Sequence, residues 1–397
     1  MNLMSGSAPI PQNDAPQVNS LEVTLFGSGY GESSVIHYGD GNWIIVDSCI
    51  ARDSTAPAAL RYLESIGVDV ASQVKAVVIT HWHDDHIKGV SEIAERCVKA
   101  EFFLSSALMT SPNKDKFLKL VLDSAASRLT NLVANSTSGI TEFSKTLDTL
   151  KKTGRKLGYA QKDTLLMDGK DFQLWALAPH TSIFEKSIEA IIAQIPDAAG
   201  AVTRVKAPTP NFASVVLWLK FKDCRILLGA DLEEASEHKG WSLIIEEMKT
   251  TVIDKKAELF KVAHHGSVTG HHPKIWTELL ADKPVCVIAP FNKPPKLPNS
   301  TDVERILGHS KDAFVTSSPH KQYKAKKLED STIKRKLAGR NAVMAYANYS
   351  YIRARRNDDA WDIKMFGERT TIKRFRSPES IASLRIACAY LVSVVVP

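Results

Sequence analysis

The sequence predicts a layered α/β domain in which strands and helices alternate along most of the chain. Short β-rich runs bounded by glycine or polar residues indicate strands, and apolar residues at helical spacing indicate helices between them. Several predicted strands end directly at histidine or aspartate, which places polar side chains at the strand ends. Of the 397 residues, 44% are apolar and 24% are charged, a composition that allows a sizeable core and excludes global disorder and a coiled coil.

Regular structure is expected to begin at Leu21. The runs LEVTLFG, SVIHYG and NWIIVDS predict strands, because each is short, β-rich and followed by a turn residue. Apolar residues at helical spacing predict a helix in the next segment, which stops at Gly67. The apolar strand KAVVIT then ends directly at His81, and a helix near residues 87–97 and the strand EFFLSS follow.

The pattern changes after the strand EFFLSS. Leucines and other apolar residues recur at helical spacing over residues 112–158, which predicts a helical hairpin inserted between strands. Strands are then expected at FQLWALAP, SVVLWLKF, RILLGAD, ELFKVA and VCVIAPF, with a helix at KIWTELL. The third of these strands ends at Asp231 and the fourth ends at His264. The loop NKPPKLP follows the last strand.

The two ends of the chain differ from the middle. Residues 1–20 are rich in Pro, Ser and Asn, and we expect a flexible tail with no secretory signal. No apolar run is long enough to cross a membrane, and the five cysteines are scattered and odd in number. These features predict a cytoplasmic protein with reduced thiols and no membrane partner.

A basic carboxy-terminal segment makes the whole chain basic. The net charge is +7, and residues 321–376 contain 16 Lys or Arg against 6 Asp or Glu, a local balance of +10. Lysine and arginine neutralise phosphates, and the interleaved aromatic residues can stack on bases, so a nucleic-acid surface is one interpretation. A solvated face, or a docking surface for an acidic protein partner, is an equally good one.

The strongest motif is the run His81-Trp82-His83-Asp84-Asp85-His86. Three imidazoles and two carboxylates directly after an apolar strand predict a metal site, because both groups are good ligands for Zn²⁺ or Mn²⁺. Alternate spacing places His81 and His83 on one side, where they can hold one metal, while Asp85 and His86 can hold a second. The competing interpretation is a solvated polar loop or a cluster that caps a helix.

This motif resembles the signature of the metallo-β-lactamase fold superfamily. The resemblance covers about residues 21–317 and implies an αββα sandwich, here a hydrolase domain over residues 21–320 with the helical insertion and with residues 321–397 as a basic extension. It implies that Asp47 orients the metal loop, that Asp231 bridges two metals and that His264 is the last histidine ligand. The intermediate histidine ligand of the superfamily has one candidate, His180, for which a plain loop position is an equal alternative.

The finer resemblance is to the hydrolase domain of DNA-uptake competence proteins and their soluble relatives. It rests on GSGYGESSVIHYG, NFASVVLWL and KVAHHGS. The resemblance implies phosphodiester cleavage in nucleic acid with two divalent metal ions, Zn or Mn. It departs from the usual pattern where Asp47 is followed by Ser48 and Cys49.

The chemistry of such a site suggests roles for individual residues. Asp85 can act both as a metal ligand and as the acceptor of the nucleophile's proton. His265 can donate a proton to the substrate, or it can be a hydrogen-bonded structural neighbour of His264. Ser267 can offer a hydroxyl to an anionic substrate or can shape the loop.

Two other functions remain open at this stage. One is a metallohydrolase of a small substrate such as a cyclic nucleotide, an ester or a lactone. The other is a nucleic-acid-binding subunit on a hydrolase fold that has lost its activity.

Overall fold

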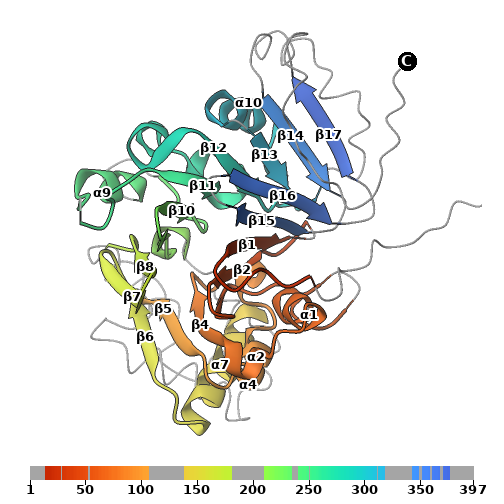
Figure 1. The fold of residues 1–397 in the computed structure, drawn as a ribbon, viewed down its shortest axis with the longest axis vertical. Coiled ribbons are helices and arrows are strands. Elements are labelled where there is room, and N and C mark those ends of the chain that lie inside the picture. Colours follow the sequence, from red (N-terminus) through yellow and green to blue (C-terminus); the bar gives the residue numbers. More distant parts are fainter. Residues whose placement is uncertain are drawn as a thin grey trace, which may run out of the picture.

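The protein is an αββα sandwich: two β-sheets pack face to face and helices cover their outer faces, as the computed structural model shows (Figure 1). The structure describes residues 14–27, 29–51, 54–106, 138–180, 210–234, 240–249, 251–310, 312–317, 342–347, 351–357, 360–366 and 370–375. The predicted α/β fold class is confirmed.

The first sheet contains eight strands in the order β16-β15-β1-β2-β3-β4-β5-β6. The strands from β16 to β3 are antiparallel to their neighbours, and those from β3 to β6 are parallel. Their bounds are β1 Leu21–Phe26, β2 Ser33–Tyr38, β3 Trp43–Val46, β4 Val74–Ile79, β5 Glu101–Ser105, β6 Leu157–Ala160, β15 Tyr351–Asn357 and β16 Ala360–Phe366.

The second sheet contains nine strands in the order β17-β14-β13-β12-β11-β10-β9-β8-β7. Its central strands from β14 to β10 are parallel, and the outer pairs are antiparallel. Their bounds are β7 Thr164–Gly169, β8 Phe172–Ala176, β9 Leu217–Phe221, β10 Cys224–Leu228, β11 Ala257–Lys261, β12 Leu280–Ile288, β13 Asp312–Val315, β14 Ala342–Ala347 and β17 Thr370–Phe375.

Three apolar clusters hold the four layers together. The middle cluster lies between the sheets, where alternate residues of β1, β3, β9 and β10 interdigitate. A second cluster lies between the first sheet and helices α1, α4 and α7, and a third lies between the second sheet and helices α9 and α10. The helices are α1 Ala58–Ser65, α2 Val70–Gln73, α3 Asp84–Ile87, α4 Val90–Arg96, α7 Ser138–Lys152, α9 Trp241–Glu246 and α10 Ser300–His309, with 3-10 turns η2 Pro210–Ala213, η3 His264–Gly266 and η4 Val268–Gly270 and the π-turn η5 Ile275–Leu279.

Some predicted helices differ in extent from the observed ones. The predicted helix at residues 87–97 is divided into α3 and α4 because Gly89 adopts a left-handed conformation with φ of 86°. The predicted helix at KIWTELL is a single π-turn that leads directly into β12. Of the predicted hairpin, α7 is observed and packs on α4, while residues 107–137 lie outside the described part of the chain.

The carboxy-terminal strands are part of the sandwich itself. β15 pairs with β1 in the first sheet, and β14 pairs with β13 in the second, so the strands β14 to β17 complete both sheets (Figure 1). The arginines of β15 are directed into ion pairs: Arg353 and Arg355 bind Asp14, and Arg356 binds Glu258. The run YIRARR therefore serves the fold at these positions, and it is not an exposed basic strip.

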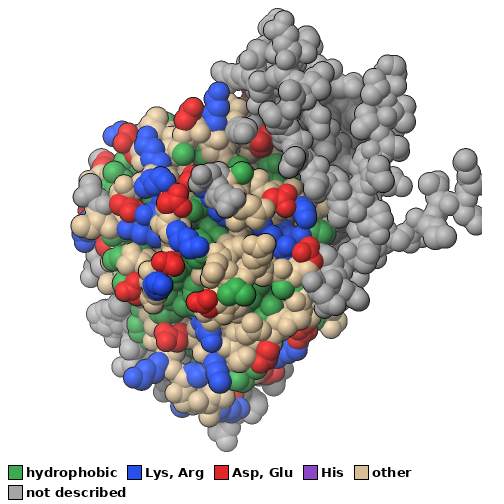
Figure 2. All heavy atoms as spheres, in the orientation of Figure 1, with side chains coloured by type: hydrophobic (Ala, Val, Ile, Leu, Met, Phe, Trp, Pro, Cys, Tyr) green, Lys and Arg blue, Asp and Glu red, His purple; other side chains and the backbone are tan. Residues whose placement is uncertain are grey.

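The face drawn in Figure 2 carries no continuous basic patch over the described residues. Lys and Arg side chains are interspersed with Asp and Glu across it. None of the described helices is long and apolar enough to cross a membrane. The four cysteines within the described residues are buried and unpaired with one another.

Candidate metal centre

Ligand-type side chains from both sheets converge at one end of the sandwich. His81, His83 and Asp231 form one group in which the ligand atoms lie within 4.8 Å of one another. Asp85, His86, Asp231 and His265 form a second group with the same property. Asp231 belongs to both groups, so its carboxylate is placed to bridge two cations.

The strand ends explain why these residues meet. β4 of the first sheet ends at Ile79 and delivers His81, and the short helix α3 then turns Asp85 and His86 back toward the same point. β10 and β11 are parallel neighbours in the second sheet, so their carboxyl ends deliver Asp231 and His265 to one edge. Ligands far apart in the sequence therefore share one site.

The backbone near the centre is strained at several positions. Asp47, Ala230, His264 and His265 have positive φ angles of 57°, 42°, 46° and 53°. Left-handed backbone is unfavourable for residues other than glycine and is commonly retained at functional sites. Here two such residues in succession turn the chain after β11 so that His265 points into the centre.

Asp47 orients the metal-binding loop. Its Oδ2 atom accepts a hydrogen bond from Nδ1 of His86 at 2.8 Å and another from the Thr80 hydroxyl at 2.7 Å, and its Oδ1 atom accepts from the Thr80 backbone N–H at 2.7 Å. His265 is fixed in the same manner, because its Nδ1 donates to the backbone carbonyl of Ala289 at 2.9 Å. Both histidines therefore present Nε2 to the cluster, at 3.2 Å from Oδ2 of Asp231.

Burial and neighbouring charges raise the pKa of some side chains in the centre and lower the pKa of others. Burial lowers the pKa of His81 well below its usual value, and the neighbouring His86 lowers it further. Burial would also lower the pKa of His265, but the Asp231 and Asp85 carboxylates outweigh it and raise the pKa to about 10. Burial would raise the pKa of Asp231, but the charges of His265 and His86 hold it well below its usual range. The Asp231 carboxylate is therefore ionised, and it favours positive charge beside it in a buried space.

The residues present fit divalent cations. Nε2 of His86 and Oδ1 of Asp231 are buried, and neither forms a well-aligned hydrogen bond with another described residue. Buried polar atoms without such a partner are costly unless a ligand compensates them. Imidazole nitrogens and carboxylate oxygens form the donor set that Zn²⁺, Mn²⁺ and Fe²⁺ accept.

The adjacent histidines His264 and His265 after β11 have different surroundings. The sequence analysis placed the last ligand at His264, but His264 lies in neither ligand group. Its Nδ1 lies 2.7 Å from the Thr269 hydroxyl and 2.9 Å from Glu233, and its Nε2 lies 3.3 Å from the Asn211 amide. His265 occupies the position in the cluster instead.

Two other predicted site residues lie away from the ligand groups. His180, the candidate intermediate ligand, pairs with Glu247 at 3.2 Å and lines a separate small cavity. Ser267 caps the next turn, since its hydroxyl accepts a hydrogen bond from the Thr269 backbone N–H at 3.2 Å. The role that the geometry gives Ser267 is to shape the loop.

The model of the metallo-beta-lactamase superfamily matches residues 27–281, well over half of the chain. The chain belongs to the metallo-β-lactamase superfamily. The superfamily resemblance inferred from the sequence is thereby confirmed, and its members are metal-dependent hydrolases. A comparison with curated proteins gave no significant match.

Solved structures with similar folds are distant in sequence. The metallo-β-lactamase fold protein YhfI from Bacillus subtilis has 14% identity and a TM-score of 0.35, with 75% of this chain and 85% of that chain covered. The short form of human tRNase Z has 12% identity and a TM-score of 0.33, with coverage of 67% and 91%. Zinc-bound PqqB from Methylobacterium extorquens has 10% identity and a TM-score of 0.32, with coverage of 60% and 71%.

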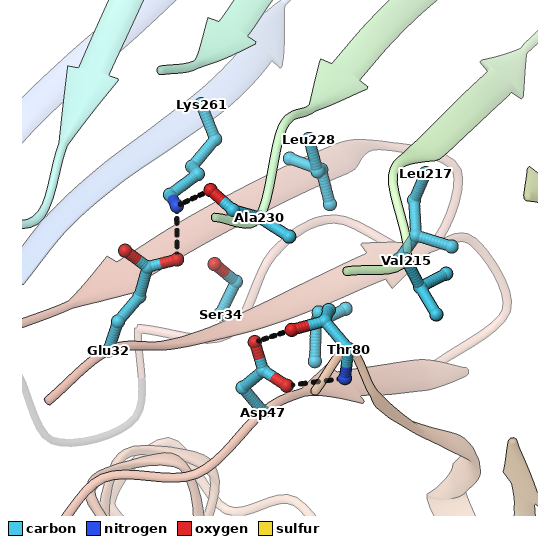
Figure 3. Close-up of a pocket in the computed structure, with 10 residues that line it drawn as sticks. Glu32, Ser34, Asp47, Thr80, Val215, Leu217, Leu228, Ala230 and Lys261 are labelled. Carbon is cyan, nitrogen blue, oxygen red and sulfur yellow. Dashed lines mark hydrogen bonds and ion pairs between the residues drawn. The ribbon is translucent and has the colours of Figure 1, made fainter. Parts of the chain in front are cut away.

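A buried ion pair that the sequence analysis missed lies next to the centre of this superfamily member. Glu32 and Lys261 point toward one another across a small cavity between the sheets (Figure 3). Nζ of Lys261 also donates to the Ala230 carbonyl at 2.8 Å and lies 3.8 Å from Oδ1 of Asp231. The available signal was a lysine within the apolar strand ELFKVA, because a lysine is rarely buried without a partner.

Glu32 of this ion pair also belongs to a third group of ligand-type residues. Glu32, Asp47 and His86 also lie close together. Lys261 already supplies positive charge to Glu32, and Asp47 already accepts from His86. This third group therefore supports the centre, and the two groups that share Asp231 are the candidates for cations.

Proposed function

We propose that the protein is a two-metal phosphodiesterase that cleaves DNA or RNA. The observation that carries the metal part of the proposal is the position of Asp231 in both ligand groups. His81, His83 and Asp231 would hold one cation, and Asp85, His86, Asp231 and His265 would hold the other. The phosphodiester part rests on the sequence resemblance to the competence-type branch and on the basic segment from residue 321 onward.

Different residues of the centre would have different roles in hydrolysis. Two bound divalent cations, Zn or Mn, would supply Lewis acidity, activate a water molecule and neutralise charge on a phosphodiester. Asp85 is ionised, since the hydrogen bond from His265 and the charge of His86 overcome burial and lower its pKa. Its carboxylate can therefore accept the proton of the attacking water. Asp47 keeps His86 in the required tautomer, and Lys261 balances the charge next to Asp231.

A second candidate function is hydrolysis of a small ester, lactone or cyclic nucleotide. One observation favours it: Arg353, Arg355 and Arg356 are engaged in ion pairs inside the fold, which removes part of the basic segment from any nucleic-acid surface. A binding subunit without activity is the least favoured, because both ligand groups are complete enough to hold cations. A cytoplasmic setting remains our expectation.

A digestion panel separates these functions. The purified protein is incubated with labelled single- and double-stranded DNA, RNA, bis-(p-nitrophenyl) phosphate and a lactone, each with Mn²⁺ or Zn²⁺. The proposal expects cleavage of polymer and diester that is abolished by Asp85→Ala and by His83→Ala. Turnover of the lactone alone would favour the second candidate, and full cleavage by both variants would exclude the assigned centre.

A further inference from the structure

Two loops border the metal centre and are tied to each other. The first is the turn between β1 and β2, where the Glu32 backbone N–H donates to the Asp85 carbonyl at 2.7 Å. The second is the Pro-rich loop after β12, which closes on itself through two backbone hydrogen bonds between Phe291 and Leu297, at 2.9 and 3.0 Å. The backbone N–H of Asn292 donates to the Gly29 carbonyl at 2.7 Å and joins the two loops.

The glycines of GSGYGES make this close approach possible. Gly29 has a φ of 105°, and a Cβ atom there would lie only 2.0 Å from Nδ2 of Asn292. Gly31 has a φ of 99°, and a Cβ atom there would lie 2.8 Å from the Cβ of Cys49. The two glycines therefore position Tyr30, the residue between them.

A ladder of aromatic rings leads outward from the centre. The Phe291 ring lies 5.4 Å from the ring of His265, with an interplanar angle of 32°. The ring of Tyr30 lies 5.7 Å from that of Phe291, and Nζ of Lys293 lies 3.3 Å from the centre of the Tyr30 ring. Both aromatic side chains are half-buried and Lys293 is exposed, so the ladder runs from a candidate metal ligand to the surface.

Lys293 has no carboxylate partner within the part of the chain that the structure describes. Among the described residues, its contact is with the Tyr30 ring, whereas Lys261 on the neighbouring strand is paired with Glu32. A cation over an aromatic face at an exposed site is only weakly stabilised and keeps its N–H groups for an anion. Flat rings beside a free ammonium group match the two parts of a nucleotide, its base and its phosphate.

We propose that Tyr30, Phe291 and Lys293 form a substrate subsite that binds the nucleotide next to the scissile phosphodiester. The two rings contact the base, and Lys293 binds the adjacent phosphate. The subsite rests on the proposed function and deepens it, because a simple ester or lactone offers neither a base nor a second negative charge.

Two diesters that share a leaving group test the subsite. Thymidine 3′-phosphate 5′-(p-nitrophenyl phosphate) carries a base and a second phosphate, and methyl p-nitrophenyl phosphate carries neither. The measured quantity is the ratio of kcat/KM for the first substrate to kcat/KM for the second. We expect Phe291→Ala and Lys293→Ala each to lower this ratio about tenfold, in keeping with the usual contribution of a stacked base or a phosphate contact. An unchanged ratio would overturn the proposal.

A matched control and a binding assay complete the test. Lys283→Ala removes the same charge from the opposite end of β12, where Lys283 is exposed, and should leave the ratio at its original value. Should the protein cleave no diester, the proposed function fails, and the subsite is judged by fluorescence anisotropy with labelled oligothymidylate. Weaker binding by Lys293→Ala, with a smaller dependence on salt concentration, supports the subsite, and equal binding by the original protein and Lys293→Ala excludes it.

Discussion

The metal centre and the arginines of β15 both bury several charged side chains, but they satisfy them in different ways. Glu22 is completely buried and accepts hydrogen bonds from Thr24, Tyr62 and Arg355, so its charge is compensated by the chain itself. At the metal centre, Oδ1 of Asp231 is buried without a hydrogen bond among the described residues. The chain therefore completes the partners of the Glu22 carboxylate, whereas Asp231 keeps a buried acceptor atom for a cation.

Asp231→Asn should have the largest effect, because it removes the carboxylate shared by both ligand groups while keeping the side-chain volume. We expect kcat/KM to fall by about four orders of magnitude or more, equivalent to about 5 kcal/mol at 1.36 kcal/mol per tenfold change. Steady-state assays with whichever substrate the original protein hydrolyses measure this loss, and circular dichroism checks that the variant is folded. Full activity in a folded variant would show that Asp231 does not bridge.

Arg355→Met should affect stability and leave the metal centre intact. The substitution leaves the buried Glu22 side chain without its cationic partner, which typically costs about 3–5 kcal/mol in the free energy of unfolding. Urea denaturation measures the loss. The double variant Glu22→Gln with Arg355→Met should recover part of it, since no unpaired charge remains. Loss of bound metal at constant stability would contradict the comparison.

The smallest expected effect is the difference in kcat/KM between variants of the adjacent histidines His264 and His265. We expect His265→Ala to lower kcat/KM about 100-fold, because it removes a ligand from the second group. His264→Ala should lower it less than about tenfold, because its contacts are with Glu233, Thr269 and Asn211. Parallel assays of the two variants decide the question, and the opposite ranking would restore the assignment made from the sequence.

The same comparison explains what the sequence could and could not predict. The ligands from His81 to His86 and at Asp231 follow buried strands directly, so their position at the sheet edge could be inferred from hydrophobic patterning. The choice between His264 and His265 could not, because it depends on two left-handed residues and on contacts with Glu233 and Asn211 from elsewhere in the chain.

The basic segment shows a similar limit. The sequence gives the number of arginines in β15, but the partners of Arg355 are Glu22 and Asp14, which lie 333 and 341 positions away. For the three arginines of β15, the fold has internal ion pairs where charge counting allowed an exposed surface. The Glu32–Lys261 pair was missed for a related reason, because the lysine in ELFKVA indicates a buried partner but does not identify Glu32, which lies far away in the sequence.

The metal content of the purified protein tests the central claim most directly. Elemental analysis after equilibration with Zn²⁺ or Mn²⁺ and removal of excess metal should give two divalent ions per chain for the original protein and fewer for Asp231→Asn. Arg355→Met, once folded, should retain two. A folded protein that retains no divalent ion under these conditions, or an Asp231→Asn variant that retains both, would contradict the account.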